Sequence, residues 1–232
     1  GEQDYGFKRL FRRLHSETPV NKSTKHIGLP LLGKQASQFY METLNALWTN
    51  PTACPVATVD VDFERINANL PDKYAALKPL LGCMLEDLED SGATIYLVPN
   101  ITLHAALDRL DMPEETRARI AHPIEAGLDA LEAEGIQHIT LAGTRHTMQS
   151  NQLADYFTAR KIKVDFPSPQ DIQALDEIRL DVFANGFSVK EKEKMDSVLS
   201  KYACVVLACT ELSLLNTDRQ FKDLARLHVE SA

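Results

Sequence analysis

Residues 203–215 read ACVVLACTELSLL, and this stretch decides how the fold is interpreted. Residues 205–207 form a short apolar, mostly β-branched run that predicts a buried strand, and Cys209 follows near its carboxyl end. Ligands bind at that end of the strands in open α/β sheets. We expect a helix to start near Glu211, capped by Thr210 or by the turn itself, and to lower the pKa of the Cys209 thiol. A small buried cysteine beside a helix cap is the alternative interpretation.

The size and charge of the chain limit the classes of function. A chain of 232 residues is long enough for one large domain or two lobes. The net charge of −8 argues against nucleic acid as a partner, because phosphate binding needs clustered Lys and Arg. Anionic small molecules stay open as ligands, since a local site can be positive. No apolar run approaches the roughly 20 residues of a membrane span, so no membrane partner is expected.

The cysteines and histidines show no framework. The four cysteines lack a CxxC motif, which predicts reduced thiols and a cytoplasmic protein. The seven histidines are scattered without the spacing of metal ligands, so no metal site is expected.

Residues 1–24 are interpreted as an extension before the first lobe. Residues 7–14 place four apolar side chains at helical spacing with basic side chains on the other face, which predicts a short basic amphipathic helix. We expect it to dock on its own domain or on a second subunit, with a membrane or a protein partner as the alternative.

Strands and helices alternate from residue 25 onward, which predicts parallel sheets with right-handed crossovers and hence the α/β class. We expect a first lobe over residues 25–119, to which residues 216–232 return, and a second lobe over residues 120–215. The predicted strands cover residues 27–32, 55–61, 93–98, 136–141, 163–166 and 205–207. The predicted helices cover residues 34–48, 72–91, 104–110, 124–131, 144–159, 171–185 and 188–202.

Four stretches of the chain together resemble the aspartate/glutamate racemase superfamily. LACTEL at 207–212 is similar to the second-cysteine motif Gly-Cys-Thr-Glu, and LAGTRHTM at 141–148 is similar to the Gly-Thr-x-x-Thr turn. VPNITLH at 98–104 is similar to the first-cysteine motif Pro-Cys-Asn-Thr-x-His, and the region of Ser37 loosely resembles the first loop. The sequence departs from the family where Asn100 replaces the first cysteine and Ile101 the following Asn.

The resemblance implies two similar α/β lobes, each a parallel sheet flanked by helices, with the active site in the cleft between them. It also implies a homodimer and a cofactor-independent amino-acid racemase, with an amino acid or dicarboxylate as small-molecule partner. Cys209 would be one acid/base, with Asn100 at the first-cysteine position and His104 near the cleft. The residues expected to bind the substrate are Ser37, Thr102, Gly143, Thr144, Thr147, Thr210 and Glu211.

Racemisation needs two groups that flank Cα, one to remove its proton and one to return a proton to the opposite face. The amide of Asn100 can do neither near neutral pH, a loss of the order of 10²–10⁴-fold unless another group substitutes. His104 is the nearest candidate, although a hydrogen-bonding histidine at a helix start is an equal interpretation. The cations that could hold a distal carboxylate are Lys163, Arg145 and Arg179.

Three functions stay open. The first is a racemase that is slow or one-sided because of Asn100. The second is a single-cysteine decarboxylase or isomerase of a small carboxylic acid, and the third is a non-catalytic relative that binds an acidic ligand. Fold analogy does not decide among them, because function depends on the site.

Overall fold

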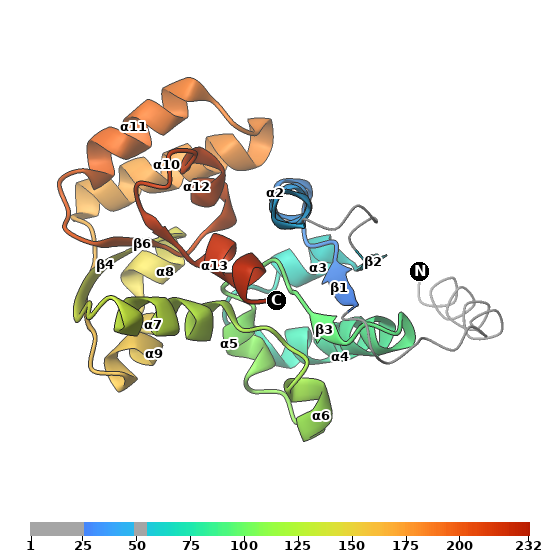
Figure 1. Ribbon diagram of the computed structural model, residues 1–232. Helices are drawn as coiled ribbons and strands as arrows, with labels where there is room; N and C mark the ends of the chain where they lie inside the picture. Colours follow the sequence, from blue (N-terminus) through green and yellow to red (C-terminus); the bar gives the residue numbers. More distant parts are fainter. Residues whose placement is uncertain (1–25, 49–54) are drawn as a thin grey trace.

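Two parallel β-sheets, each flanked by helices, form the protein (Figure 1). This computed structural model describes residues 26–48 and 55–232. A three-stranded sheet has the order β2-β1-β3, and a four-stranded sheet has the order β5-β4-β6-β7. The predicted α/β class is therefore confirmed. The predicted basic helix over residues 7–14 lies outside the described residues.

The first sheet is built around β1 (Ile27–Pro30), which pairs with β2 (Val56–Val59) and β3 (Ile95–Tyr96). All four residues of β1 are buried, as expected for a central parallel strand that is covered on both faces. The helices of this half are α2 (Lys34–Leu47), α3 (Phe63–Asn67), α4 (Tyr74–Asp90), α5 (His104–Leu107) and α6 (Glu114–Arg117).

The second sheet is built around β4 (His138–Ala142) and β6 (Val205–Leu207), with β5 (Lys163–Asp165) and β7 (Lys222–Asp223) at its edges. The predicted strand over residues 205–207 is confirmed and is fully buried. The helices of this half are α7 (Pro123–Ala133), α8 (Arg145–Gln149), α9 (Ala154–Ala159), α10 (Pro169–Asn185), α11 (Val189–Leu199), α12 (Thr210–Leu215) and α13 (Leu224–Ser231).

One predicted helix is wrong, because residues 144–159 form two helices, α8 and α9. Ser150 has an extended backbone (φ −130°, ψ 156°), which ends α8. The hydroxyl of Ser150 and the side chain of Gln152 both bind Nε2 of His146. Short polar side chains that bind nearby groups compete with the helix, and here they interrupt it.

The chain after α12 contacts both halves, whereas the sequence predicts that residues 216–232 return to the first lobe. Strand β7 pairs with β6 and so extends the second sheet. Helix α13 then packs against α7 of the second half and α2 of the first, and it lies between the two halves in Figure 1.

A shared hydrophobic core joins the two halves. One buried cluster includes Leu29 of β1 and Phe39 of α2 together with Leu141 of β4 and Leu224 of α13. Within it, the hydroxyl of Tyr40 donates to Nδ1 of His228 over 2.9 Å. Because apolar side chains from both sheets interlock, the two halves keep a fixed relative position, and so do the strand ends that they present.

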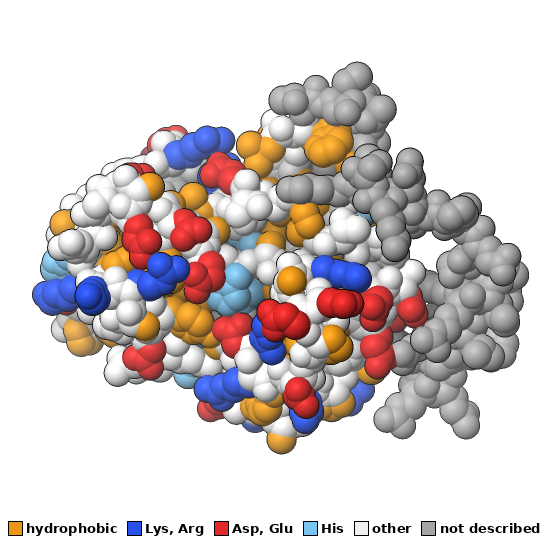
Figure 2. Space-filling model, turned by 60° about the horizontal axis from the view of Figure 1, so that its bottom comes forward, with side chains coloured by type: hydrophobic (Ala, Val, Ile, Leu, Met, Phe, Trp, Pro, Cys, Tyr) orange, Lys and Arg blue, Asp and Glu red, His pale blue; other side chains and the backbone are white. Residues whose placement is uncertain are grey.

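Two further features of the described residues are the distribution of surface charge and the lengths of the helices. On the face shown in Figure 2, the basic side chains lie among acidic ones. Within residues 26–48 and 55–232, every helix is too short or too polar to cross a membrane.

Candidate active site

A cavity of about 420 Å³ lies where strands of both sheets end. The first half contributes the segment after β3, with Asn100 and Thr102. The second half contributes Thr144 after β4 and Cys209 after β6. Six of the predicted site residues therefore line one cavity: Asn100, Thr102, Thr144, Cys209, Thr210 and Glu211.

The thiol of Cys209 is held by a neighbouring carboxylate. Cys209 is the N-cap of α12, and its Sγ–H donates to Oε2 of Glu211 over 2.7 Å. Burial raises the pKa of the Cys209 thiol well above its usual value, and the Glu211 charge raises it further, while Arg179 opposes them. The predicted lowering of this pKa is therefore wrong, because desolvation and a carboxylate outweigh the N-terminus of a helix of six residues.

Asn100 lines the cavity from the first half, and its side chain also binds the backbone. Its Oδ1 accepts from the N–H of Leu103 over 3.0 Å, which leaves the amide NH₂ group to face a ligand. Its backbone carbonyl accepts from Nδ1 of His104 over 2.9 Å. This wall therefore offers hydrogen bonds but no side chain of Asn100 that can exchange a proton.

His104 lies behind the wall and not among the residues that line the cavity. It is completely buried, and its ring packs edge-on against His122 and His228, each with ring centroids 5.1 Å away. Burial lowers the pKa of His104 to about 3, helped by His122. The neutral ring fixes the backbone of Asn100, and the structure does not bring it to the cavity as a second acid/base.

Gly143, Thr147 and Ser37 also lie outside the cavity lining. The hydroxyl of Thr144 accepts from the N–H of Thr147 over 3.1 Å and so caps α8. A Cβ on Gly143 would lie 3.2 Å from the carbonyl oxygen of Ala208, so a larger residue would require this turn and the strand end before Cys209 to move apart by a few tenths of an ångström. These residues shape the wall from behind.

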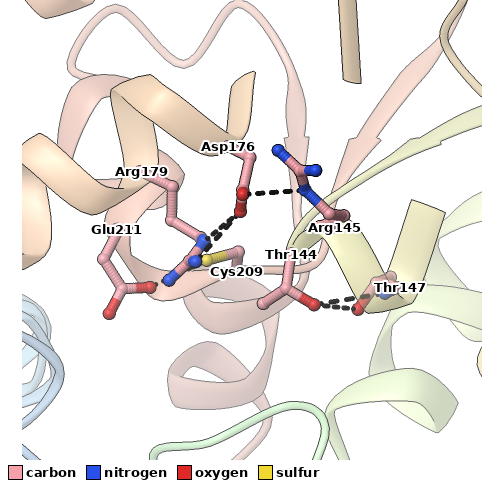
Figure 3. A network of polar contacts seen from close by, with 7 residues as sticks. All are labelled: Thr144, Arg145, Thr147, Asp176, Arg179, Cys209 and Glu211. Carbon is pink, nitrogen blue, oxygen red and sulfur yellow. Dashed lines mark hydrogen bonds and ion pairs between the residues drawn. The ribbon is translucent and has the colours of Figure 1, made fainter. Parts of the chain in front are cut away.

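A buried carboxylate that the sequence did not indicate organises the cations of the site. Asp176 of α10 binds Arg145 of α8 and Arg179 of α10, and all three residues line the cavity (Figure 3). Two of the three predicted cations are thus in place. Lys163 is not, because it pairs with Asp165 on the exposed edge strand β5. The ionic pair Asp176–Arg179 has helical i, i+3 spacing, the one signal that could have pointed to Asp176.

Apolar side chains form the mouth of the cavity, and no motif indicated them. They come from α3, from the turn after it and from α10, and they are Phe63, Leu70, Leu180 and Phe183. Phe63 lies over Gly33, where a Cβ would be 3.0 Å from its ring. Gly33 has φ +87°, a conformation that L side chains rarely adopt.

Among the residues that the structure describes, no three His, Cys, Asp or Glu side chains are grouped so that they could hold a metal ion. Cys83, Cys204 and Cys209 are free thiols, as the sequence predicted for them.

Comparisons with solved structures and protein families agree with the fold described above. An aspartate racemase homologue from Pyrococcus horikoshii is 20% identical with a TM-score of 0.72, covering 89% of this chain and 96% of the other. Aspartate racemase from Picrophilus torridus is 16% identical with a TM-score of 0.68, covering 88% and 90%. Glutamate racemase from Francisella tularensis, in complex with D-glutamate, is 14% identical with a TM-score of 0.59, covering 89% and 78%.

At these identities the structural likeness establishes the fold. No curated protein matches the chain. The family model for Asp/Glu/Hydantoin racemase matches residues 30–229, nearly the whole described chain, and supports a racemase-type enzyme. The chain belongs to the Asp/Glu/Hydantoin racemase family.

Proposed function

We propose that this protein is a cofactor-independent enzyme that exchanges the Cα proton of an amino acid of the aspartate/glutamate type. The observation that carries the proposal is the Cys209 thiol, hydrogen-bonded to Glu211 in a cavity that Asn100 also lines. The second half thus contributes a proton-exchanging group and the first half a hydrogen-bonding amide, and in the proposed complex the Cα of the substrate lies between them.

The cavity offers groups that suit an acidic amino acid. Arg145 and Arg179 supply positive charge for a carboxylate, and the hydroxyls of Thr102 and Thr210 supply hydrogen bonds. Removing the Cα proton pushes the electron pair toward the α-carboxylate, so donors fixed around that carboxylate stabilise the transition state.

Proton transfer must begin with a protonated thiol. The Cys209 proton passes to Oε2 of Glu211, and the thiolate then accepts the Cα proton while the electron pair of the C–H bond moves into the carboxylate. The thiol exchanges this proton with solvent and returns a solvent proton to the same face of the carbon, and Glu211 then gives its proton back to the thiolate. Because Asn100 has no proton to give from the other face, exchange with retention is the main reaction and inversion is slow.

The protonated thiol also favours a second candidate, decarboxylation. Loss of CO₂ from a small carboxylic acid leaves the electron pair on carbon without any base. The Sγ–H of Cys209 then gives its proton to that carbon, and the thiolate is reprotonated through Glu211. Such a reaction needs a single acid on a single face, which is what Cys209 and Asn100 together offer.

Proton NMR in D₂O tests the first proposal. L- and D-aspartate and L- and D-glutamate are incubated with reduced protein, and the Cα–H signal is followed together with the enantiomer ratio. We expect the signal of one enantiomer to disappear without inversion. Cys209→Ala should abolish this exchange, and Cys83→Ala, which changes an exposed thiol on α4, should leave it unchanged.

The other results separate the alternatives. Exchange that persists in Cys209→Ala would contradict the assigned acid/base. No exchange with any of the four amino acids would leave a decarboxylase or a non-catalytic protein that binds an acidic ligand, which CO₂ release from a panel of malonic acids would distinguish. The homodimer stays a prediction of the resemblance and the cytoplasmic location a prediction from the cysteines, and light scattering after gel filtration tests the first of them.

A further inference from the structure

Asp176 joins two arginines that belong to different helices. Its Oδ1 accepts from Nε of Arg179 over 3.1 Å and from Nη2 over 2.9 Å, and its Oδ2 accepts from Nε of Arg145 over 3.0 Å. The residue is 7% exposed, whereas a carboxylate is normally exposed unless it is paired. One buried carboxylate therefore fixes guanidinium groups of α8 and α10 (Figure 3).

The shared carboxylate leaves part of each guanidinium group for a ligand. Within the described part of the chain, Arg145 donates through Nε and Arg179 through Nε and Nη2, so terminal nitrogens remain on both. The trio carries one net positive charge, which the carboxylate of Glu211 in the same cavity offsets. What the trio offers a carboxylate is therefore the N–H donors that remain, at a place that the planar guanidinium groups determine.

We propose that Asp176 is a positioning residue that sets where the carboxylate of the substrate binds, and thereby which length of acidic chain the site prefers. This inference rests on the proposed function in so far as the cavity takes a carboxylic acid. Asp176 acts through Arg145 and Arg179, which use three N–H donors to bind its carboxylate.

Two substitutions of Asp176 have different consequences. Asp176→Glu keeps the charge but adds a methylene, which moves the bound guanidinium groups away from α10 and into the cavity. The affinity for the shorter acid should therefore rise relative to that for the longer one. Asp176→Asn keeps one oxygen acceptor but replaces the other by an NH₂ donor that faces an arginine. That arginine loses its partner, and the distinction between acids of different length weakens.

Titration calorimetry with succinate and glutarate tests the inference. These acids have the chain lengths of aspartate and glutamate but no amino group, so no reaction follows binding. We expect Asp176→Asn to weaken the binding of whichever acid the parent binds more tightly by about 10- to 100-fold. The ratio of the two Kd values should then come close to one. Asp176→Glu should shift the ratio toward succinate.

The matched control is Asp181→Asn on the same helix. Asp181 accepts from the side chain of Asn185 and does not line the cavity, so this variant should bind as the parent does. A melting curve accompanies each variant. Should Asp176→Asn fail to fold, the Kd ratio in Asp176→Glu tests the proposal. Arg145→Gln accompanies it and should also weaken the binding of the acid that the parent binds more tightly.

Unchanged Kd ratios in the folded Asp176 variants would overturn the proposal, and so would a parent protein that binds neither acid. These failures are distinct from a failure of the proposed function. Binding that depends on Asp176, without Cα exchange in NMR, would contradict the proposed function and leave the role of Asp176 supported. Cα exchange together with binding that does not depend on Asp176 would support the proposed function and contradict the role of Asp176.

Discussion

Sγ of Cys209 lies 2.7 Å from Oε2 of Glu211, two residues further along at the start of α12. The carboxylate accepts the thiol proton and, through its charge, makes the thiolate harder to form. The same carboxylate is the nearest acceptor for that proton. Glu211 thus keeps Cys209 protonated at rest and takes up its proton during a reaction.

Glu211→Gln should make the thiol more acidic and the enzyme slower. Removal of the charge lowers the pKa of Cys209, so alkylation of this cysteine by iodoacetamide at neutral pH should become several-fold faster. Cα exchange should fall by about 10²-fold, because the proton acceptor is lost. Peptide mass spectrometry distinguishes Cys209 from the exposed Cys83, whose alkylation rate serves as the control. Slower alkylation of Cys209 in the variant would contradict this electrostatic assignment.

The variant Asn100→Cys should invert the configuration at Cα in addition to exchanging the Cα proton. A second thiol, contributed to the cavity by the first half, would supply the second acid/base, so L-aspartate incubated with the variant should yield D-aspartate at a rate at least about 10²-fold above the parent. The variant loses the hydrogen bond from Oδ1 to the N–H of Leu103 and should be less stable by about 1 kcal/mol. Chiral chromatography measures the inversion.

The double variant Asn100→Cys with Cys209→Ala is the control for that gain. It carries one thiol, contributed by the first half only, so inversion should disappear again. Inversion that is equally fast in the parent and in Asn100→Cys would mean that a group other than Asn100 already serves the second face.

The class of the fold and the strands other than β7 could be predicted because their signals are local. The run of residues 205–207 is apolar and mostly β-branched, and it forms β6. The break between α8 and α9 could not be predicted, because it depends on side chains of Ser150 and Gln152 that meet His146 only in the folded chain. Polar contacts that follow folding override helical periodicity there.

The candidate site divides in the same way. Cys209, Asn100 and Thr144 follow strands of parallel sheets, so their meeting in one cavity follows from the sequence pattern. The pKa of Cys209 and the role of Asp176 do not follow from the sequence pattern. The pKa of Cys209 depends on burial and on the side-chain conformation of Glu211. The role of Asp176 depends on a contact with Arg145, 31 positions earlier in the chain.

The buried His104 should make the fold sensitive to acid. Its pKa is about 3 in the folded protein against about 6.5 in an unfolded chain, so between these values the unfolded state binds the additional proton. The stability that the neutral ring contributes is present above pH 6.5 and is lost as the pH falls toward 3. At pH 5 the loss from this residue amounts to about 2 kcal/mol.

Urea unfolding at pH 7 and pH 5 measures this loss, and His104→Gln should make it smaller by a similar amount. The variant loses packing at both pH values, so the comparison concerns the difference between them. His138→Gln on β4 is the control, because His138 is exposed and pairs with Asp165. An equal pH dependence in the parent and in His104→Gln would contradict the assignment.

Gly143→Ala should impair both stability and exchange, whereas Gly82→Ala should not. A Cβ at Gly143 would lie 3.2 Å from the backbone oxygen of Ala208 and 3.1 Å from Cγ2 of Thr147, so the turn before α8 must move away from the strand end. We expect a cost of about 1–3 kcal/mol in the free energy of unfolding, together with slower exchange because Arg145 moves with α8. At Gly82 in α4 a Cβ would meet nothing within 4 Å, and alanine there should stabilise the helix by about 0.5–1 kcal/mol. Urea unfolding and Cα exchange of both variants provide the comparison, and a Gly143→Ala protein as stable and active as the parent would show that this close approach does not shape the site.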